Sequence, residues 1–291
     1  MMQEPSIIAI VPVVDPCMTQ PRKRLFASTR LFLFGLISLA AIGFGPFADK
    51  AFGAEINVMI SGGFSAAFRS LTPGFEQLTA HKLVMISGPS MGSAKDAIPV
   101  RLQRGEDADV VIMVGAALDD LINKGQVIAD SRVDLATSAI GMAVRTGEAK
   151  PDIASVEAFR RTLLEARTIA YSDSASGVYI SNELFNRLGI TEQMKGKRRS
   201  IPGEAVGTVV ARGQADIGFQ QISELLPIKG IEIVGTLPSH IQQISVFSAG
   251  IATNAKAQDA ARELIRYFSS PAAFAAIKDS GLQPISATVS N

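Results

Sequence analysis

The sequence predicts an α/β protein with mostly parallel sheets and two similar lobes. Segments with strand patterns alternate with segments of helical periodicity along the chain, which is typical of strand–helix–strand units. The segment DVVIMV at 109–114 is almost continuously apolar, as expected of a strand buried on both faces of a parallel sheet.

A repeated element supports the second half of this prediction. AIPVRLQRGEDADVV (97–111) and AVGTVVARGQADIGF (205–219) both carry Arg-Gly after an apolar helical pattern, then Ala-Asp, then a strand pattern. One copy lies in each half of the chain, which indicates two similar α/β units with a cleft between them. Common helix-stop chemistry at Arg-Gly is the alternative explanation.

The individual elements follow from period-2 and period-3.6 patterns and from the Gly and Pro residues that bound them. Pro99 should start or kink its helix, and the basic run at 194–199 is expected to be a solvated loop or helix end. The expected strands are 55–61, 82–86, 109–114, 140–145, 168–171, 217–220, 231–234 and 245–251. The expected helices are 65–78, 94–103, 118–123, 156–165, 178–188, 205–211, 257–268 and 272–279.

The composition is that of an ordinary globular protein. The 291 residues are 47% hydrophobic and 19% charged, with a net charge of +1. This is enough for one large or two medium domains. No stripe of Lys and Arg and no zinc-finger or helix-turn-helix spacing is present, so nucleic acid is not expected as a partner.

The first 53 residues have the pattern of a removable export signal. Four basic residues between positions 22 and 30 precede an apolar run of about 15 residues at 31–45, and small residues follow at 51–54. We therefore expect cleavage near Gly53 and a periplasmic product; a membrane anchor is the alternative, but the run is short for one. Met18 is an alternative start, because residues 1–17 do not resemble such a signal.

Export with cleavage removes the single cysteine, Cys17. The remaining chain then has no disulfide, thiol nucleophile or thiolate metal site. His81 and His240 are isolated and lack zinc-site spacing. We therefore expect no metal and no cofactor.

Three expected strand-to-helix junctions are rich in Ser and Gly: 61–65, 87–93 and 172–177. Free N–H groups of a first helical turn, together with hydroxyls, can hold an anion without a formal counter-charge. Helix capping and turn formation are the alternative role of each loop taken singly. Because three such loops should lie at the carboxyl ends of strands in both halves, we predict an anion-binding cleft.

Two features near these loops leave alternatives open. Asp173 suits an anion site poorly, so it is expected either to cap a helix or to bind a hydroxyl. Gln220 and Gln221 end a strand, where they could donate to a ligand carboxylate or serve as turn residues.

Residues 104–114, SASGVY at 174–179 and RGQADIGF at 212–219 resemble the periplasmic molybdate-binding proteins, which are solute-binding components of ABC importers. The resemblance covers nearly the whole chain from about position 54 to 283. It implies a two-lobed periplasmic binding protein fold, each lobe a mostly parallel sheet flanked by helices, joined by two crossover strands. The lobes would comprise 54–138 plus 240–291, and 139–239. A small anionic ligand, an inner-membrane ABC permease and a monomeric state are further implications.

The resemblance also implies a set of ligand-binding residues. Gly63 stands where the family has a serine, and Gln220 stands where the family has a tyrosine, which argues for an organic anion in place of molybdate. Ser90 or Ser93 matches the second-loop serine, and Ser176 and Val206 match backbone donors. The full expected set is Ser61, Gly62, Gly63, Ser65, Ser90, Ser93, Ser174, Ser176, Gly177, Val206 and Gln220.

SGGFSAAF, GPSMG and GFQQISEL resemble a branch of this family similar to aconitate isomerase, an exported enzyme. This gives two alternatives: a receptor that captures a small anion for ABC-type import, or an isomerase that interconverts trans- and cis-aconitate. An isomerase needs an acid–base group in the cleft. The candidates are Tyr179, Asp173 and Arg145, the last as a carboxylate clamp. No Ser–His–Asp order is present, which argues against a hydrolase.

Overall fold

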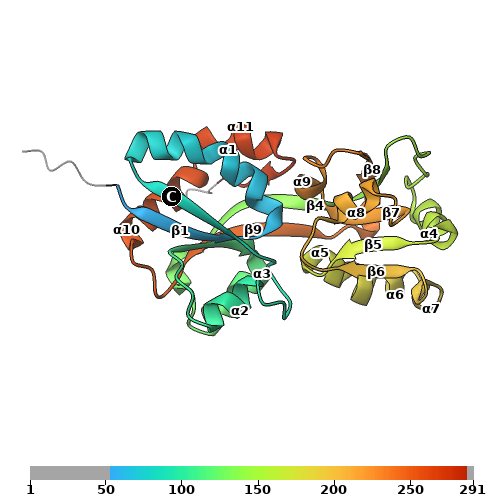
Figure 1. Ribbon diagram of the computed structural model, residues 1–291, viewed down its shortest axis with the longest axis horizontal. Coiled ribbons are helices and arrows are strands. Elements are labelled where there is room, and N and C mark those ends of the chain that lie inside the picture. The colour runs from blue at the N-terminus through green and yellow to red at the C-terminus, as the bar shows by residue number, and fades with distance from the viewer. Residues whose placement is uncertain (1–52, 287–291) are drawn as a thin grey trace, which may run out of the picture. The chain divides into compact units, whose positions relative to one another are not determined.

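The computed structural model describes residues 53–286 (Figure 1). The predicted export signal, with Cys17 and Met18, lies outside the described residues. No helix within 53–286 combines the length and apolar character needed to cross a membrane.

Ten strands of the described chain form one hydrogen-bonded sheet in the order β2-β1-β3-β9-β4-β7-β5-β6, with β8 and β10 also pairing with β4. The strands are β1 (Glu55–Ile60), β2 (Lys82–Ser87), β3 (Val110–Val114), β4 (Val133–Arg145), β5 (Ile169–Ser172), β6 (Arg198–Ile201), β7 (Ile217–Gln221), β8 (Ile231–Thr236), β9 (Ile244–Ile251) and β10 (Gln283–Pro284).

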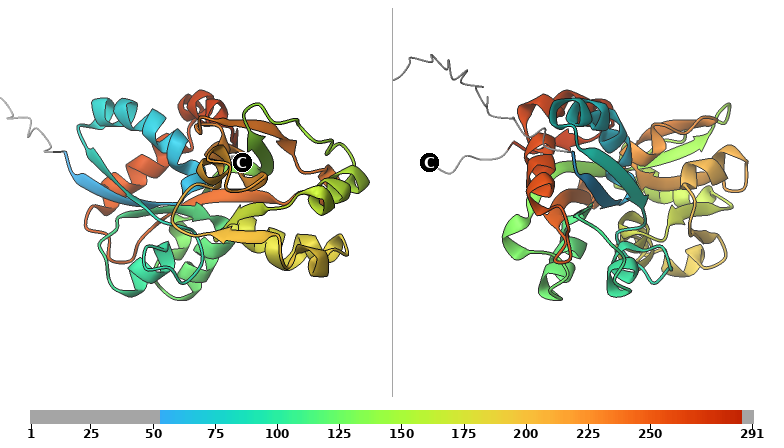
Figure 2. Two further views of the ribbon diagram at one scale, coloured as in Figure 1. Left: turned by 45° about the vertical axis from the view of Figure 1, so that its right-hand side comes forward. Right: turned by 60° about the vertical axis from the view of Figure 1, so that its left-hand side comes forward.

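The helices connect and cover these strands. Helix α1 contacts both α10 and α11 (Figure 2). The α-helices are α1 (Gly62–Thr79), α2 (Ile98–Gln103), α3 (Gly115–Asn123), α4 (Val156–Glu165), α5 (Ala175–Tyr179), α6 (Phe185–Arg187), α7 (Thr191–Met194), α8 (Val206–Ala211), α9 (Ile222–Leu225), α10 (Gln258–Phe268) and α11 (Phe274–Asp279). A π-helical turn, Ile180–Leu184, joins α5 to α6.

The sheet contains two groups of parallel strands. β1 pairs in parallel with β2 and β3, and β5 pairs in parallel with β6 and β7. The antiparallel strand β4 joins the groups, because its residues 133–139 pair with β9 and its residues 140–145 pair with β7 and β8. This arrangement confirms the predicted fold class. The residue bounds of the two lobes stay a prediction.

Two large clusters of buried side chains accompany the two groups of strands. One contains Phe64, Phe75 and Phe268 and lies around β1, α1 and α10. The other contains Phe159, Phe185 and Phe219 and lies around β5, β7 and α4. Phe159 and Phe219 meet edge to face at 5.8 Å between ring centroids. The chain therefore supports each group of strands with its own apolar core.

The repeated sequence element corresponds to equivalent structural units. Its first copy forms α2 and β3, and its second forms α8 and β7. Each aspartate accepts a backbone hydrogen bond in or just before a neighbouring strand: Asp109 from the Asn57 N–H of β1 at 2.8 Å, and Asp216 from the Arg167 N–H, before β5, at 2.8 Å. The repeat therefore reflects a shared helix–strand unit and not helix-stop chemistry alone.

Several elements differ from the sequence prediction: α7, α9 and β10 were not predicted, and the helix expected at 178–188 begins at Ala175 and contains a π-helical turn. Three further differences have clear physical causes. The helix expected at 94–103 begins only at Ile98, which leaves Pro99 in its first turn, where a missing N–H costs nothing. The strand expected at 140–145 begins at Val133, because β9 pairs with its first half. Residues 194–199 were predicted to be a solvated loop or helix end, and this was wrong for the last two residues. Arg198 and Arg199 begin β6, an exposed edge strand that pairs with β5.

Candidate functional site

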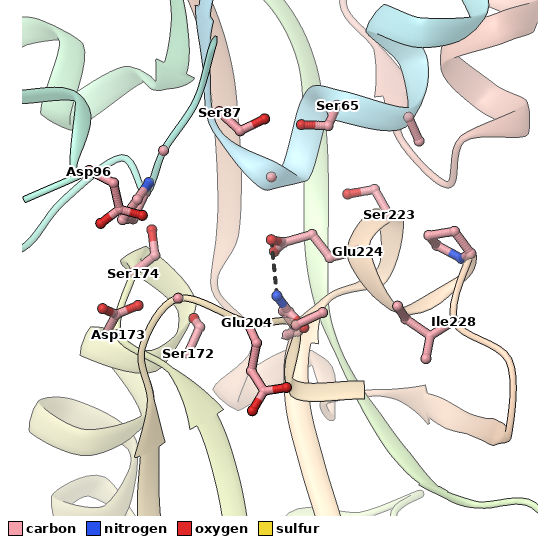
Figure 3. A pocket seen from close by; sticks show the side chains of 18 of the residues that line it. Ser65, Ser87, Asp96, Ser172, Asp173, Ser174, Glu204, Ser223, Glu224 and Ile228 are labelled. Atoms are coloured by element: carbon pink, nitrogen blue, oxygen red, sulfur yellow. Dashed lines mark hydrogen bonds between the residues drawn. The ribbon is translucent and has the colours of Figure 1, made fainter. Parts of the chain in front are cut away.

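A cavity of about 380 Å³ lies between segments from both groups of strands (Figure 3). This volume is within the range of small-molecule sites. Its lining comes from the start of α1, the segments that follow β2 and β5, the loop before α8, the end of β7, and α9. All three Ser- and Gly-rich loops predicted from the sequence contribute to this cavity or to the smaller one beside it.

The structure brings most of the predicted binding residues together. Gly62, Ser65, Ser174 and Gln220 line the main cavity, and so does the acid–base candidate Asp173. The smaller cavity shares Gly62, Ser174 and Glu224 with the main one. It is also lined by the predicted residues Ser61, Gly63, Ser90 and Ser176.

Five predicted residues line neither cavity: Ser93, Gly177, Val206, Tyr179 and Arg145. Tyr179 is buried, and its hydroxyl donates to the Ile241 carbonyl at 2.6 Å and accepts from Arg187 at 3.0 Å. Arg145 lines a different cavity and forms an ion pair with Glu148 there. Tyr179 and Arg145 therefore make their contacts outside the two adjoining cavities.

The start of α1 presents unpaired donors to the smaller cavity. This helix has 18 residues, and the N-cap Ser61 makes no side-chain capping bond. The first N–H groups of a helix have no intrahelical acceptor, and the helix dipole adds positive potential there. A bound anion or an acceptor group of a ligand can take these donors.

Three buried side-chain oxygens within residues 53–286 have no hydrogen-bond partner: Ser61 Oγ, Gln221 Oε1 and Ser223 Oγ. Each of these residues lines one of the two adjoining cavities. A buried unpaired polar group costs about 1–3 kcal/mol. Their grouping at one place indicates that a bound molecule completes their hydrogen bonding.

A chain of hydrogen bonds fixes one wall of the main cavity. The Val206 N–H donates to Gln220 Oε1 at 2.9 Å, and Gln220 Nε2 donates to Glu224 Oε1 at 3.0 Å. Because a backbone N–H can only donate, it determines which end of the Gln220 amide faces Glu224. The predicted donor Val206 and the predicted contact Gln220 thus bind each other, and Gln220 orients a carboxyl group.

Glu224 is the most consequential of the site residues that the sequence did not predict; the others include Ser223 and Arg69. Its carboxyl group points into the cavity from α9 and has no ion pair within the described chain (Figure 3). Burial raises the pKa of Glu224 to about 7, and hydrogen bonds from the Gln220 side chain and the Gln221 backbone offset part of that effect. Glu224 therefore exchanges its proton near neutral pH.

The other charged groups of the main cavity lie around Glu224. Asp96 and Asp173 lie on one side, together with Ser174 (Figure 3). Burial raises the pKa of Asp173, with a smaller contribution from the charge of Asp96. Glu204 lines the cavity but is paired with Arg212. Arg69 of α1 is the one basic residue in the lining.

Two of the predicted glycines are needed for close packing at the site. A methyl group at Gly63 would lie 2.1 Å from the Phe247 ring, which also lines the smaller cavity. A methyl group at Gly62 would lie 2.2 Å from Glu224 Oε1. Both distances are far below van der Waals contact, so a serine side chain has no space at position 63 in this packing.

Comparison with known proteins places this chain among extracellular binding proteins. Residues 56–283 match the family described as bacterial extracellular solute-binding protein. An aconitate isomerase of Pseudomonas sp is 49% identical over 232 residues, covering 80% of this chain and 88% of that protein. Molybdate-binding protein ModA of Azotobacter vinelandii is 27% identical over 255 residues, covering 84% and 95%.

The solved structure of the Azotobacter vinelandii periplasmic molybdate-binding protein has the same fold. It matches with a TM-score of 0.62 at 21% identity, over 78% of this chain and 98% of that one. The resemblance inferred from the sequence is thereby confirmed. The protein belongs to the family of bacterial extracellular solute-binding proteins.

Proposed function

We propose that the protein binds a small organic polycarboxylate in the main cavity and its smaller neighbour. The observation that carries the proposal is the grouping of unpaired buried oxygens beside the start of α1. A carboxylate can accept from the Ser61 and Ser223 hydroxyls and from helix N–H groups, whereas Gln221 Oε1 can only accept a hydrogen bond. We further propose that the protein is exported to the periplasm, works as a monomer and delivers its ligand to an inner-membrane ABC permease.

The departures from the molybdate-binding pattern support an organic ligand. Gly63 leaves no room for a serine side chain beside Phe247, and Gln220 uses its amide to hold Glu224. A compact tetrahedral oxyanion would therefore lack the serine and tyrosine contacts that the molybdate-binding pattern provides at positions 63 and 220. The charges are also separated, because Arg69 belongs to α1 while Asp96 and Asp173 lie around the opposite loops. A polycarboxylate long enough to reach both Arg69 and the start of α1 uses this arrangement better than a compact oxyanion does.

A melting panel tests the ligand class. We expect citrate, cis-aconitate or trans-aconitate to raise the melting temperature of the purified protein, and molybdate, tungstate and sulfate to leave it unchanged. A ligand at 100 times its dissociation constant adds about 2.7 kcal/mol. For a protein of this size that is a shift of roughly 5–10 °C. A shift with molybdate or tungstate alone would contradict the proposal.

Ser223 offers a sharper test within the site. We expect Ser223→Ala to leave the ligand-free protein as stable as before or slightly more so, because the hydroxyl is buried without a partner. The same change should weaken polycarboxylate binding by about 2-fold to 10-fold, the value of one hydrogen bond. Calorimetric titration measures the affinity and thermal melting the stability.

Ser280→Ala is the matched control, because Ser280 is also buried but donates to the Ala276 carbonyl at 2.8 Å outside both cavities. This variant should lose about 1 kcal/mol of stability and keep its affinity. Equal affinities for the Ser223 variant and the wild type would remove Ser223 from the site.

A second candidate function is isomerisation of the bound ligand. The relative that is 49% identical is described as an aconitate isomerase, and such a shift of a double bond needs a group that accepts and returns a proton. Glu224 is such a group in the cavity, with a pKa of about 7. Conversion of trans-aconitate to cis-aconitate by the purified protein, followed by chromatography, distinguishes an enzyme from a receptor.

A further inference from the structure

The Glu224 carboxyl lies beside the first residue of α1. The 2.2 Å between its Oε1 atom and a methyl group built at Gly62 means that only a glycine permits this approach. Both cavities are lined by Glu224 and Gly62. A molecule that occupies the two cavities together therefore passes directly in front of this carboxyl group.

The carboxyl group is held in one orientation. Gln220 donates to Oε1, and its own amide is fixed by the Val206 N–H. Ser223, the neighbouring residue on α9, contributes an unpaired buried hydroxyl to the same wall. An oriented acid–base group next to unpaired donors is the arrangement that proton transfer requires.

The start of α1 and Ser61 supply the complementary part of such a site. A ligand carboxylate that binds the free N–H groups of α1 and the Ser61 hydroxyl would lie in the smaller cavity, which Glu224 also lines. Removal of a proton from the carbon adjacent to that carboxylate delocalises negative charge onto the carboxylate. Donors that already point at those oxygens stabilise the charge as it develops.

We propose that Glu224 is the catalytic residue that carries a proton between two carbons of an unsaturated tricarboxylate, an inference that rests on the proposed ligand class. The ionised Glu224 takes a proton from the methylene carbon next to the bound carboxylate. The C–H electron pair forms a new double bond to the central carbon. The former double-bond pair takes the proton back from Glu224 at the other carbon. One C–H bond breaks, one forms, and Glu224 returns to its ionised state.

The titration of Glu224 matches this role. Its pKa of about 7 allows it to accept a proton and release it again at neutral pH. The charged groups that share the cavity are Arg69 from α1, Asp96 after β2, Asp173 after β5 and Glu204 before α8. As base, Glu224 must be ionised first, so kcat should rise with pH up to about 7 and level off above it.

The test uses trans-aconitate as the probe and the purified protein. We expect wild type to convert it to cis-aconitate. Glu224→Gln should lose at least 1000-fold in kcat, while its affinity for trans-aconitate, measured by titration, stays within about fivefold. The amide that this change introduces can still accept from Gln220 but cannot take a proton from carbon. Glu232→Gln is the control, because Glu232 pairs with Lys150 outside both cavities, and it should convert trans-aconitate at the wild-type rate.

The outcomes separate this inference from the proposed function. Binding of trans-aconitate by wild type without conversion, or equal conversion by Glu224→Gln, overturns the role of Glu224 and leaves the ligand class intact. An absence of binding to every tricarboxylate overturns both. If Glu224→Gln does not fold, the pH profile of wild type decides: kcat should fall about tenfold per pH unit below 7. A flat profile between pH 5 and 8 would overturn the inference.

Discussion

Replacing Asp109 by alanine is expected to lower the free energy of unfolding by about 3–5 kcal/mol, as for the loss of one partner in a buried charged network. Asp109 is 3% exposed, and its carboxylate accepts three backbone N–H groups: from Asn57 at 2.8 Å, from Lys256 at 2.7 Å and from Ala257 at 2.9 Å. Those donors belong to β1 and to the segment that begins α10. Alanine would leave all three without an acceptor.

Thermal melting measures the effect, because about 2–4 °C is lost per kcal/mol in a protein of this size. Asp107→Ala is the matched control. Asp107 is exposed and pairs only with the Lys256 side chain, so its loss should cost less than about 1 kcal/mol. Similar losses in the two variants would show that the backbone contacts of Asp109 contribute little.

This network also explains why the fold was predictable from the sequence. The Ala-Asp pairs of the two repeats can be recognised in the sequence. Asp109 binds Asn57 of the parallel strand β1, and Asp216 binds Arg167, two residues before the parallel strand β5. Local constraints of this kind leave a pattern in the sequence. The strand at 110–114 is a second case, since a strand buried on both faces must be apolar.

Elements that depend on distant partners were less predictable. The first half of β4 carries Asp134 and Thr137, and it becomes a strand because β9 pairs with it from more than 100 residues away. β6 begins with two exposed arginines and exists because the edge of β5 is available. Sequence periodicity does not contain this information, because the decisive contacts are made by the tertiary structure.

The site divides in the same way. The Ser- and Gly-rich loops were found because helix starts have a local signature. Glu224 was not predicted because its own residue type does not distinguish a buried carboxylate from a surface one. Its spacing of four residues from Gln220 in GFQQISEL was the available signal, since a strand end and the following turn bring these two side chains together. Arg145 and Tyr179 have side chains suited to an acid–base or clamping role, but the topology places them outside the two cavities.

Gly177→Ala should destabilise the protein by about 3 kcal/mol, at the upper end of the cost of overpacking. A methyl group there would lie 1.5 Å from the Ser172 carbonyl oxygen and 2.6 Å from its carbonyl carbon. Both are backbone atoms at the end of β5, so no side-chain rotation can relieve the contact. The segment between β5 and α5 would have to move, and with it Ser174 and Ser176, which line the two cavities.

The variant should therefore lose stability and ligand binding together, which distinguishes it from an ordinary core mutation. Gly196→Ala is the matched control, because no atom lies within 4 Å of a methyl group at that position and its backbone is not left-handed. Alanine there should be neutral or should stabilise the protein by about 0.4–1 kcal/mol, because it lowers the conformational entropy of the unfolded chain. Melting curves recorded with and without trans-aconitate give both quantities. A Gly177 variant that melts lower but keeps the full ligand-induced shift would show that the loop between β5 and α5 does not hold the ligand.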